Sequence, residues 1–428
     1  MNWQEVYNNK LVSVEEASSK VESGDRIWIG AYAGIPVQLV EALADRVNEL
    51  ENVELVSALI CHPFKCIQSK EYIGKINFNS IFFGPYERKF FKVGNVHINS
   101  VHFANTYYAL KEVYKVNTLF SEVSVPDEDG YMYYGPIGVS WNGPVAEYAK
   151  KKIVQVNKFQ PKVKGAMNRI HVSEVDWICE HDHPLAELSQ PPVSEKDKKI
   201  ASYIIPLIPD GATLQVGLGG IANAVAYGLV DKKNLSVHTE MLTDSLVYLA
   251  RKGVINGKIL AGFGLGSQAV YDFVGECKAD LAPIHLVNEP YTAGQNEKFI
   301  SINSALMADV TGQIGSESIG FNQFSCTGGQ LDYVRAAGIS KGGKSFVCMG
   351  STVKGKDGSI NSTITVQLPP GQAVTTPRTD VMYVVTEYGM ADLYNKPIEK
   401  RVKAMISIAH PDFREKLTKE AKEAGLIK

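Results

Sequence analysis

The sequence predicts an α/β protein, and two observations lead to this class. Short apolar, β-branched runs such as RIWIG, VELVSALI, TLQVG and VMYVVT alternate with amphipathic stretches along the chain. This alternation is typical of parallel strands covered by helices. In addition, residues 24–43 and 211–229 share one pattern, in which an apolar strand, a glycine/alanine turn and a Gly-Ile pair precede an amphipathic helix. We therefore predict two similar α/β units with mostly parallel sheets.

The most natural division of the chain lies at SQPPVSEKDKK. Pro191 and Pro192 interrupt regular structure there, and Ser194 can cap the helix that follows. A chain of 428 residues, 45% of them hydrophobic, is long enough for about two or three domains. We expect an N-terminal domain over residues 1–190 and a C-terminal domain over residues 191–428.

The charge and the N-terminal stretch exclude several classes of partner. The formal net charge is -2 and the charged residues are spread along the chain, so nothing indicates binding to nucleic acid or to a membrane surface. The stretch MNWQEVYNNKLVSVEEA lacks the features of a signal peptide, and no apolar run approaches the roughly 20 residues that a bilayer requires. We expect a cytoplasmic protein.

The six cysteines are scattered without the spacing of a disulfide framework, so we expect reduced thiols. One cluster, CEHDH, places Cys179, His181 and His183 close together. A closed zinc site needs four ligands, and no second pair lies at a suitable spacing nearby. We expect a polar loop here and no metal ion.

A glycine-rich turn in the second half indicates a ligand. GATLQVGLGGIANAV predicts a buried strand, a turn with Gly217, Gly219 and Gly220, and then a helix. Small residues let a ligand approach the backbone, and a helix N-terminus favours a phosphate or carboxylate. The turn loosely fits the dinucleotide fingerprint, so a nucleotide-type ligand is expected and a nucleotide-dependent dehydrogenase is one alternative. Two further glycine-rich runs, residues 261–273 and 324–337, also precede predicted helices.

Glu240 lies near the end of the strand that NLSVHTEMLTD predicts. When the two repeats are aligned, Ala58 occupies the position that corresponds to Glu240. A carboxylate needed by the scaffold would be expected in both copies, so its presence in one copy favours a functional role. The alternative is a solvent-exposed glutamate at the end of a strand.

Several long motifs in order carry a resemblance to a known family. GLGGIANAV, HTEMLTD, VNEP, INSALMADVTGQIGSESIG, QFSCTGGQLDYVRAA, AVTTPRTDVMYVVTEYGMADL and AMISIAHPDF resemble the family I coenzyme A transferases of the acetyl-CoA hydrolase/transferase branch, which includes 4-hydroxybutyrate and butyryl-CoA:acetate CoA-transferases. The resemblance covers essentially the whole chain. It implies two open α/β domains with the active site between them, and homo-oligomers are usual in such families.

The resemblance implies that Glu240 is the nucleophile of a CoA-transferase. Its carboxylate would attack an acyl-CoA to give an acyl-glutamyl anhydride, and the CoA thiolate would then form a glutamyl-CoA thioester. CoA would pass between short-chain acids, such as acetate and 4-hydroxybutyrate or butyrate, with ping-pong kinetics. Acyl-CoA and carboxylates would be the substrates, and no permanently bound cofactor is required.

The resemblance also implies further site residues. Asn288 and the backbone amide of Gly329 would stabilise the oxyanion, although both could be turn residues, and Glu387 would orient the nucleophile or be a buried structural acid. Arg335 could pair with Asp332 or another acid. The expected CoA contacts are Gly217, Leu218, Gly219, Gly220, Ile221, Gly315, Gly338 and Lys354, and Lys354 could equally be a solvated turn lysine.

Several alternatives stay open. Tyr32, His62, Phe83 and Tyr86 follow expected strand ends in the first half and could line the acyl side of the cleft, or could simply pack. An acyl-CoA hydrolase would use the same glutamate with water as the acceptor, and a requirement for an acceptor acid separates the two activities. A non-catalytic CoA-binding module would bind CoA without turnover. A thiolase-like role for Cys326 has no histidine base beside it.

Overall fold

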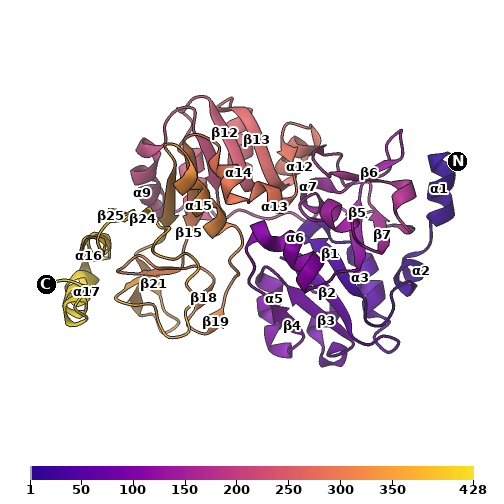
Figure 1. Ribbon diagram of the computed structural model, residues 1–428, viewed down its shortest axis with the longest axis horizontal. Helices are drawn as coiled ribbons and strands as arrows, with labels where there is room; N and C mark the ends of the chain where they lie inside the picture. Colours follow the sequence, from indigo (N-terminus) through magenta and orange to yellow (C-terminus); the bar gives the residue numbers. More distant parts are fainter. Residues whose placement is uncertain (1) are drawn as a thin grey trace. The chain divides into compact units, whose positions relative to one another are not determined.

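The computed structural model describes residues 2–428, which form two compact units. Unit 1 comprises residues 2–189, Met241–Thr243 and Leu260–Val287, whereas unit 2 comprises Gln190–Glu240, Asp244–Ile259 and Asn288–Lys428. Both units hold mostly parallel sheets with helices, so the predicted α/β class is confirmed (Figure 1). The chain passes between units close to residue 190, and unit 1 also takes up two later segments.

Unit 1 is built on a seven-stranded sheet in the order β10-β7-β5-β1-β2-β3-β4. All of its strand pairs are parallel. The strands are β1 (Arg26–Ala31), β2 (Val53–Ala58), β3 (Ile76–Ser80), β4 (Val96–Ile98), β5 (Thr118–Val123), β7 (Lys151–Val156) and β10 (Trp177–Glu180). Every residue of β5, an inner strand of this sheet, is buried, which agrees with a parallel sheet covered on both faces.

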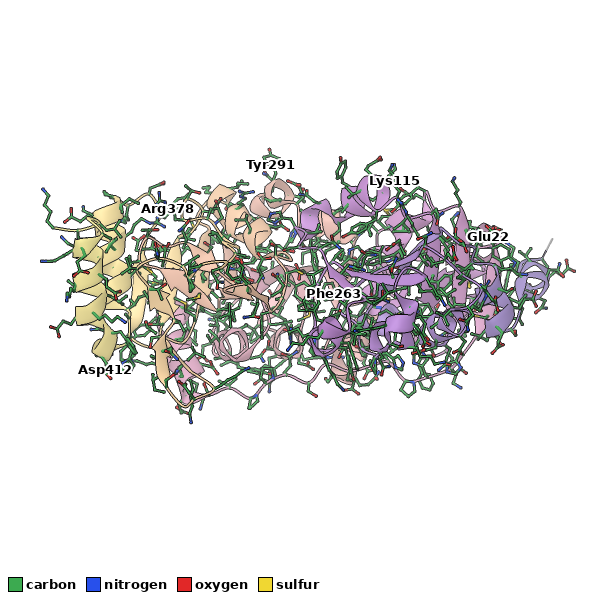
Figure 2. All side chains as sticks on the ribbon, turned by 90° about the horizontal axis from the view of Figure 1, so that it is seen from below. Glu22, Lys115, Phe263, Tyr291, Arg378 and Asp412 are labelled. Carbon is green, nitrogen blue, oxygen red and sulfur yellow. The ribbon has the colours of Figure 1, made fainter. Side chains whose placement is uncertain are left out.

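Short helices and strand pairs complete unit 1. The helices are α1 (Trp3–Lys10), α2 (Val14–Ser19), α3 (Val37–Ala44), α4 (Lys65–Gln68), α5 (Pro85–Phe90), α6 (Thr106–Tyr108), α7 (Gly135–Gly138), α8 (Asn142–Ala146), α12 (Gln268–Gly275) and α13 (Ile284–Val287). Strand β6 (Tyr131–Tyr133) pairs with β9 (Arg169–His171), and β8 (Lys164–Gly165) pairs with β14 (Asp280–Leu281). A core of buried side chains includes Trp28, Trp141 and Phe263, the last of which is labelled in Figure 2.

The second sheet has nine strands in the order β25-β24-β20-β15-β11-β12-β13-β14-β8. Its first seven strands lie in unit 2, except for residues 241–242 and 260–264, which belong to unit 1. These seven strands are β11 (Thr213–Val216), β12 (Leu235–Leu242), β13 (Ile255–Gly264), β15 (Phe299–Ser304), β20 (Lys344–Cys348), β24 (Tyr383–Thr386) and β25 (Gly389–Asp392). β11 pairs in parallel with both β12 and β15, whereas β24 and β25 are antiparallel.

The helices of unit 2 are α9 (Glu195–Ile204), α10 (Gly220–Tyr227), α11 (Asp244–Arg251), α14 (Pro290–Gly294), α15 (Gln330–Ile339), α16 (Ile398–Ser407) and α17 (Pro411–Glu423). The predicted cap is confirmed, because the Ser194 side chain accepts a hydrogen bond from the Asp197 N–H at the start of α9. Unit 2 also contains three small sheets. One consists of β16 (Met307–Asp309), β17 (Ile314–Gly315) and β23 (Ile364–Thr365). The second pairs β18 (Ser318–Ile319) with β19 (Asn322–Gln323), and the third pairs β21 (Thr352–Lys354) with β22 (Ile360–Ser362). Tyr291 in α14 is 67% exposed and projects from the surface (Figure 2).

The two units share the repeated pattern that the sequence predicts. β1 lies between β2 and β5, and β11 lies correspondingly between β12 and β15. The first copy contains one extra turn, Tyr32–Gly34, before α3 begins, whereas only three residues separate the end of β11 from the start of α10. Within residues 2–428, no helix has the length and apolar composition needed to cross a membrane.

Candidate active site

Glu240 is the sixth residue of β12 and lies toward the C-terminal end of that parallel strand. Its neighbours Thr239 and Met241 are buried, while Glu240 itself is partly exposed. Ligands of open α/β sheets bind beyond the carboxyl ends of the strands. The position therefore combines a buried environment with access for a substrate.

Two N–H donors contact the Glu240 carboxylate. Nδ2 of Asn288, which is fully buried, lies 2.9 Å from Oε2 of Glu240. The backbone N–H of Gly329, the residue that precedes α15, donates the second hydrogen bond. A Cβ atom on Gly329 would overlap both Oε2 of Glu240 and Nδ2 of Asn288. Only glycine can therefore bring its backbone this close to the carboxylate.

The surroundings of Glu240 raise the pKa of its carboxyl group into the neutral pH range. Burial raises the pKa of Glu240 to about 7, and the nearby carboxylate of Asp332 also raises it. The hydrogen bonds from Asn288 and Gly329 act in the opposite direction, because they stabilise the charged form. Near neutral pH the group is therefore divided between a carboxylic acid and a carboxylate.

Two residues at the start of α15 contact Asn288, and the sequence motifs did not assign either of them to the site. The hydroxyl of Tyr333 donates to Oδ1 of Asn288 over 2.7 Å. Oδ2 of Asp332 lies 3.5 Å from Nδ2 of the same side chain. Both residues are buried. Both residues directly follow the TGGQ motif, which is the one feature of the sequence that could have indicated them. Their contacts with Asn288, however, span about 45 residues of sequence, which local patterns do not report.

Glu317, a second buried carboxylate, anchors the turn that carries Gly329. Its Oε1 atom accepts hydrogen bonds of 3.1 Å from Thr327 and Thr375. Its backbone carbonyl accepts from the N–H groups of Phe324 and Ser325. Thr327 directly precedes Gly328, which has a positive φ of 56°, and Gly329. The sequence did not point to Glu317.

The predicted CoA turn follows β11, the strand adjacent to β12. The sheet register pairs Leu214 with Val237, and the two strands are parallel, so the turn leaves β11 at the same edge of the sheet toward which Glu240 lies on β12. Gly219 has a φ of 112°, and Gly220 begins α10, so this turn needs glycine. The turn consists of Gly217, Leu218, Gly219, Gly220 and Ile221, and Leu218 is exposed.

Other predicted residues lie elsewhere in unit 2. Gly338 is nine residues beyond Gly329 along α15, or roughly 14 Å at the rise of a helix. Gly315 pairs with Met307 between β16 and β17. Lys354 lies on the exposed hairpin of β21 and β22.

Glu387 follows β24 and has its own polar partners. The N–H and hydroxyl of Ser351 donate to it over 2.8 Å and 2.9 Å, and Lys196 lies 3.5 Å away. Burial alone would raise the pKa of Glu387, but the bonds from Ser351 and the charge of Lys196 bring it below its usual value. Among the bonds of the described residues, Glu387 and Glu240 share no partner. Arg335 pairs with Asp380 at 3.1 Å, the second of the two kinds of partner expected for it.

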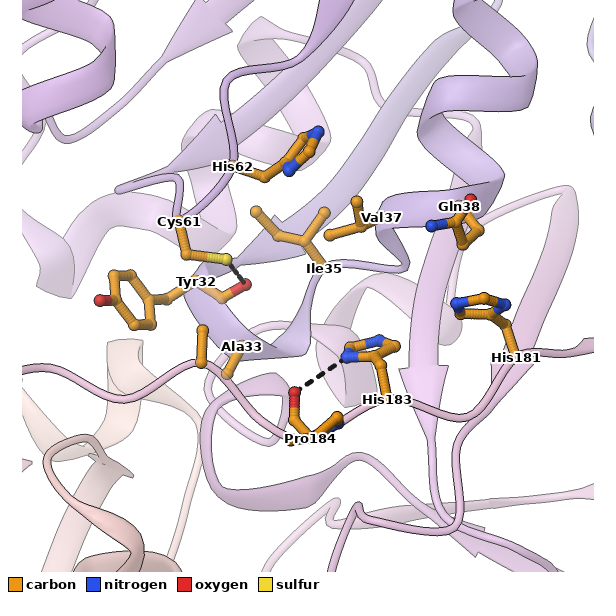
Figure 3. Close-up of a pocket in the computed structure, with 11 residues that line it drawn as sticks. Tyr32, Ala33, Ile35, Val37, Gln38, Cys61, His62, His181, His183 and Pro184 are labelled. Carbon is orange, nitrogen blue, oxygen red and sulfur yellow. Dashed lines mark hydrogen bonds between the residues drawn. The ribbon is translucent and has the colours of Figure 1, made fainter.

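Unit 1 contains a small pocket of about 230 Å³ (Figure 3). Its wall is mainly apolar, with Ala33, Ile35 and Val37 beside Cys61 and His183. Of the four side chains that could line an acyl site or simply pack, Tyr32 and His62 lie on this wall, whereas Phe83 is buried in the interior. Burial raises the pKa of Cys61 to about 12, so this thiol stays protonated near neutral pH.

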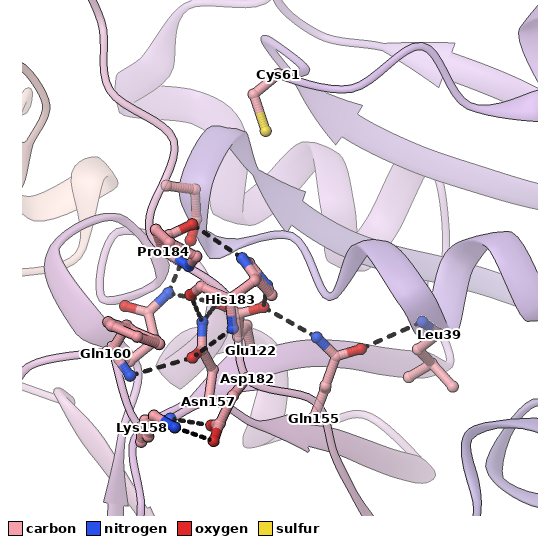
Figure 4. A network of polar contacts seen from close by, with 12 residues as sticks. Leu39, Cys61, Glu122, Gln155, Asn157, Lys158, Gln160, Asp182, His183 and Pro184 are labelled. Carbon is pink, nitrogen blue, oxygen red and sulfur yellow. Dashed lines mark hydrogen bonds and ion pairs between the residues drawn. The ribbon is translucent and has the colours of Figure 1, made fainter.

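A buried carboxylate lies behind this pocket, and polar side chains surround it (Figure 4). Glu122 is fully buried, and side-chain amides of Gln155, Asn157 and Gln160 donate to its two oxygens. Nε2 of His183 lies 2.7 Å from Oε2 of Glu122, and this contact raises the pKa of His183. His183 of the CEHDH cluster therefore has a carboxylate partner. No group of three or more His, Cys, Asp or Glu side chains within residues 2–428 is arranged to hold a metal ion.

Comparisons with known proteins agree with this geometry. Residues 1–188 match the acetyl-CoA hydrolase/transferase N-terminal domain, and residues 266–421 match the C-terminal domain of the same family. The chain is 39% identical to the 4-hydroxybutyrate coenzyme A transferase of Clostridium kluyveri, with 99% of this chain and 100% of the relative covered. It is 36% identical to the butyryl-CoA:acetate CoA-transferase of Anaerostipes caccae, with 100% and 99% covered.

A solved structure supports the same assignment. RipA from Yersinia pestis is 33% identical, covers 100% of both chains and superposes with a TM-score of 0.93. The chain therefore belongs to the acetyl-CoA hydrolase/transferase family, and it is an enzyme of the CoA-transferase type. The family resemblance inferred from the motifs is confirmed.

Proposed function

We propose that this enzyme transfers coenzyme A between acetate and a short-chain acid such as 4-hydroxybutyrate or butyrate, with Glu240 as the nucleophile. The observation that carries the proposal is the Glu240 carboxylate with two N–H donors, from Asn288 and Gly329, on it. The activities named for the relatives from Clostridium kluyveri and Anaerostipes caccae support the choice of acids.

The chemistry needs only the carboxylate and the two substrates. An oxygen of Glu240 attacks the thioester carbonyl, the C–S bond breaks, and CoA leaves as a thiolate while an acyl-glutamyl anhydride forms. The thiolate then attacks the glutamyl carbonyl, and the first carboxylate leaves with the electrons of the C–O bond. The resulting glutamyl-CoA thioester reacts with the second acid through the same steps in reverse, so the mechanism is ping-pong.

The two N–H donors are suited to the second attack. If Oε1 of Glu240 carries the acyl group, Oε2 is the carbonyl oxygen that becomes negatively charged when the thiolate attacks. Nδ2 of Asn288 is already 2.9 Å from this oxygen, and Gly329 donates from the backbone. Donors placed before the charge develops lower the barrier without further reorganisation.

We propose that the turn of Gly217, Leu218, Gly219, Gly220 and Ile221 contacts CoA. Its support is the position of the turn after the C-terminal end of β11, which pairs in parallel with the strand that carries Glu240, together with the N-terminus of α10, which favours phosphate. Gly315, Gly338 and Lys354 are weaker candidates for CoA contacts. Glu387 pairs with Ser351 and Lys196, so a structural role for it is the simpler proposal. Cytoplasmic localisation and a homo-oligomeric state stay predictions.

The test is a transfer assay with purified protein. Acetyl-CoA, butyryl-CoA and 4-hydroxybutyryl-CoA serve as donors, each with and without an acceptor acid. We expect new acyl-CoA only when an acceptor is present, parallel lines in double-reciprocal plots, and no transfer by Glu240→Gln. CoA release at the same rate without an acceptor would favour the alternative, an acyl-CoA hydrolase that uses the same glutamate, an activity that the family name also covers.

A further inference from the structure

Tyr333 is a buried residue of the Glu240 site whose hydroxyl is directed at Asn288. We infer that Tyr333 is a positioning residue, which keeps the Asn288 amide turned with its N–H toward Glu240 throughout the reaction cycle. Its hydroxyl donates to Oδ1 of Asn288 over 2.7 Å, while Nδ2 of the same amide donates to Glu240. The inference rests on the proposed function, because it assigns a role within that chemistry.

The position of Tyr333 is fixed by packing. Its ring is only 1% exposed and stacks on Phe299, with centroids 6.1 Å apart and an interplanar angle of 25°. Both residues belong to a small apolar cluster with Ala293, Ala336 and Met382. Burial, together with the charges of Glu240 and Asp332, raises the pKa of Tyr333 well above its usual value. The hydroxyl therefore keeps the proton that it donates to Asn288.

The amide of Asn288 has one accepting end and one donating end. In the present orientation the Tyr333 hydroxyl meets the accepting oxygen, and the NH₂ group meets Glu240 at 2.9 Å and Asp332 at 3.5 Å. A half-turn of the amide would direct its oxygen at two carboxylates and its NH₂ group at the Tyr333 oxygen, and the hydrogen bond that Tyr333 donates to Oδ1 would be lost. While Glu240 is ionised, charge alone therefore favours the observed orientation.

The situation changes when Glu240 is covalently modified. The anhydride and the thioester carry no charge on the glutamyl group, so the attraction that orients the amide becomes weaker. The contact with Asp332 is long at 3.5 Å and contributes little. The 2.7 Å bond from Tyr333 does not depend on the charge of Glu240. It can therefore keep the N–H in place for the next oxyanion.

The variant Tyr333→Phe removes only the hydroxyl and tests this inference. We expect kcat for CoA transfer to fall about tenfold, roughly the effect of one lost hydrogen bond, with KM for acyl-CoA within about twofold of wild type. The matched control is Tyr271→Phe, since Tyr271 is equally buried and its hydroxyl donates to the carbonyl of Ala186 at 2.6 Å within unit 1. This control should keep the wild-type kcat.

Two further readouts separate positioning from a purely structural effect. Starting from the isolated glutamyl-CoA form, reaction with acetate should be slowed by Tyr333→Phe more than the first half-reaction from free enzyme. In an Asn288→Ala background, the same change should have no additional effect on kcat. A wild-type kcat for Tyr333→Phe, or effects of the two variants that simply multiply, would overturn the inference. If wild-type protein forms no CoA adduct on Glu240, the proposed function itself fails.

Discussion

Nδ2 of Asn288 lies 2.9 Å from Oε2 of Glu240, and Asn288 is itself fully buried. The backbone N–H of Gly329 donates to the same carboxylate. The group that we propose as nucleophile is therefore already bound to the donors that would stabilise an oxyanion on it. The same buried position makes the carboxyl group of Glu240 harder to ionise.

The pH dependence of kcat/KM follows from the pKa of Glu240. Burial raises that pKa to about 7, and only the ionised carboxylate can attack. We expect kcat/KM for acetyl-CoA to be low at pH 5, to rise through about pH 7 and to level off above about pH 8. Initial rates between pH 5 and 9 measure this limb. A flat profile between pH 6 and 8 would contradict the assignment.

Asp332→Asn should move this limb to lower pH. The Asp332 carboxylate raises the pKa of Glu240 by repulsion, so removing its charge makes ionisation of Glu240 easier. The same pH series on the variant measures the shift. Asp380→Asn, which removes the partner of Arg335, is the matched control and should leave the limb in place. A limb that stays in place, or moves to higher pH, in Asp332→Asn would refute the electrostatic explanation.

Replacement of Asn288 should reduce turnover strongly. Asn288→Ala removes one of two oxyanion donors, and loss of such a donor typically lowers kcat by about 10²-fold. Asn288→Asp should be more severe, because a second carboxylate beside Glu240 also raises the pKa of that residue. Asn256→Ala changes an exposed asparagine and serves as the control. Equal kcat values for all three variants would rule out a donor role for Asn288.

Glu240→Gln should stabilise the folded protein at alkaline pH. The pKa of Glu240 is about 7 in the folded protein, compared with 4.5 for an unperturbed glutamate. The folded state therefore binds the proton more tightly than the unfolded state. The resulting penalty is absent below about pH 4.5, grows as the pH rises, and reaches about 3 kcal/mol above pH 7. Thermal unfolding should give a higher Tm for Glu240→Gln than for wild type at pH 8, and similar values at pH 4.5. If Glu240→Gln is no more stable than wild type at pH 8, the ionised Glu240 carboxylate does not destabilise the fold, and this prediction is wrong.

Local patterns allowed much of the fold to be predicted. The strands and helices of residues 24–43 and 211–229 follow from hydrophobic spacing, and the cap at Ser194 follows from its place before a helix. The assignment of Met241–Thr243 and Leu260–Val287 to unit 1 is different in kind. It depends on packing between distant segments, which periodicity does not report.

The site shows the same division. The sequence motifs predicted Glu240, Asn288 and Gly329 as residues of one site, and in the fold Asn288 and Gly329 both donate hydrogen bonds to Glu240. The hydroxyl of Tyr333 was not predicted, because its partner lies 45 residues away in sequence. Motif order equally gave no sign that Glu387 pairs with Ser351 and Lys196.

The central claim is that Glu240 becomes covalently attached to CoA. Its most direct test is intact-protein and peptide mass spectrometry after incubation with acetyl-CoA, butyryl-CoA or 4-hydroxybutyryl-CoA, with and without borohydride. We predict a CoA adduct on the peptide that contains Glu240 and, after borohydride, its replacement by the corresponding alcohol at that residue. Unmodified Glu240 with every donor, in protein that nevertheless transfers CoA, would contradict the account.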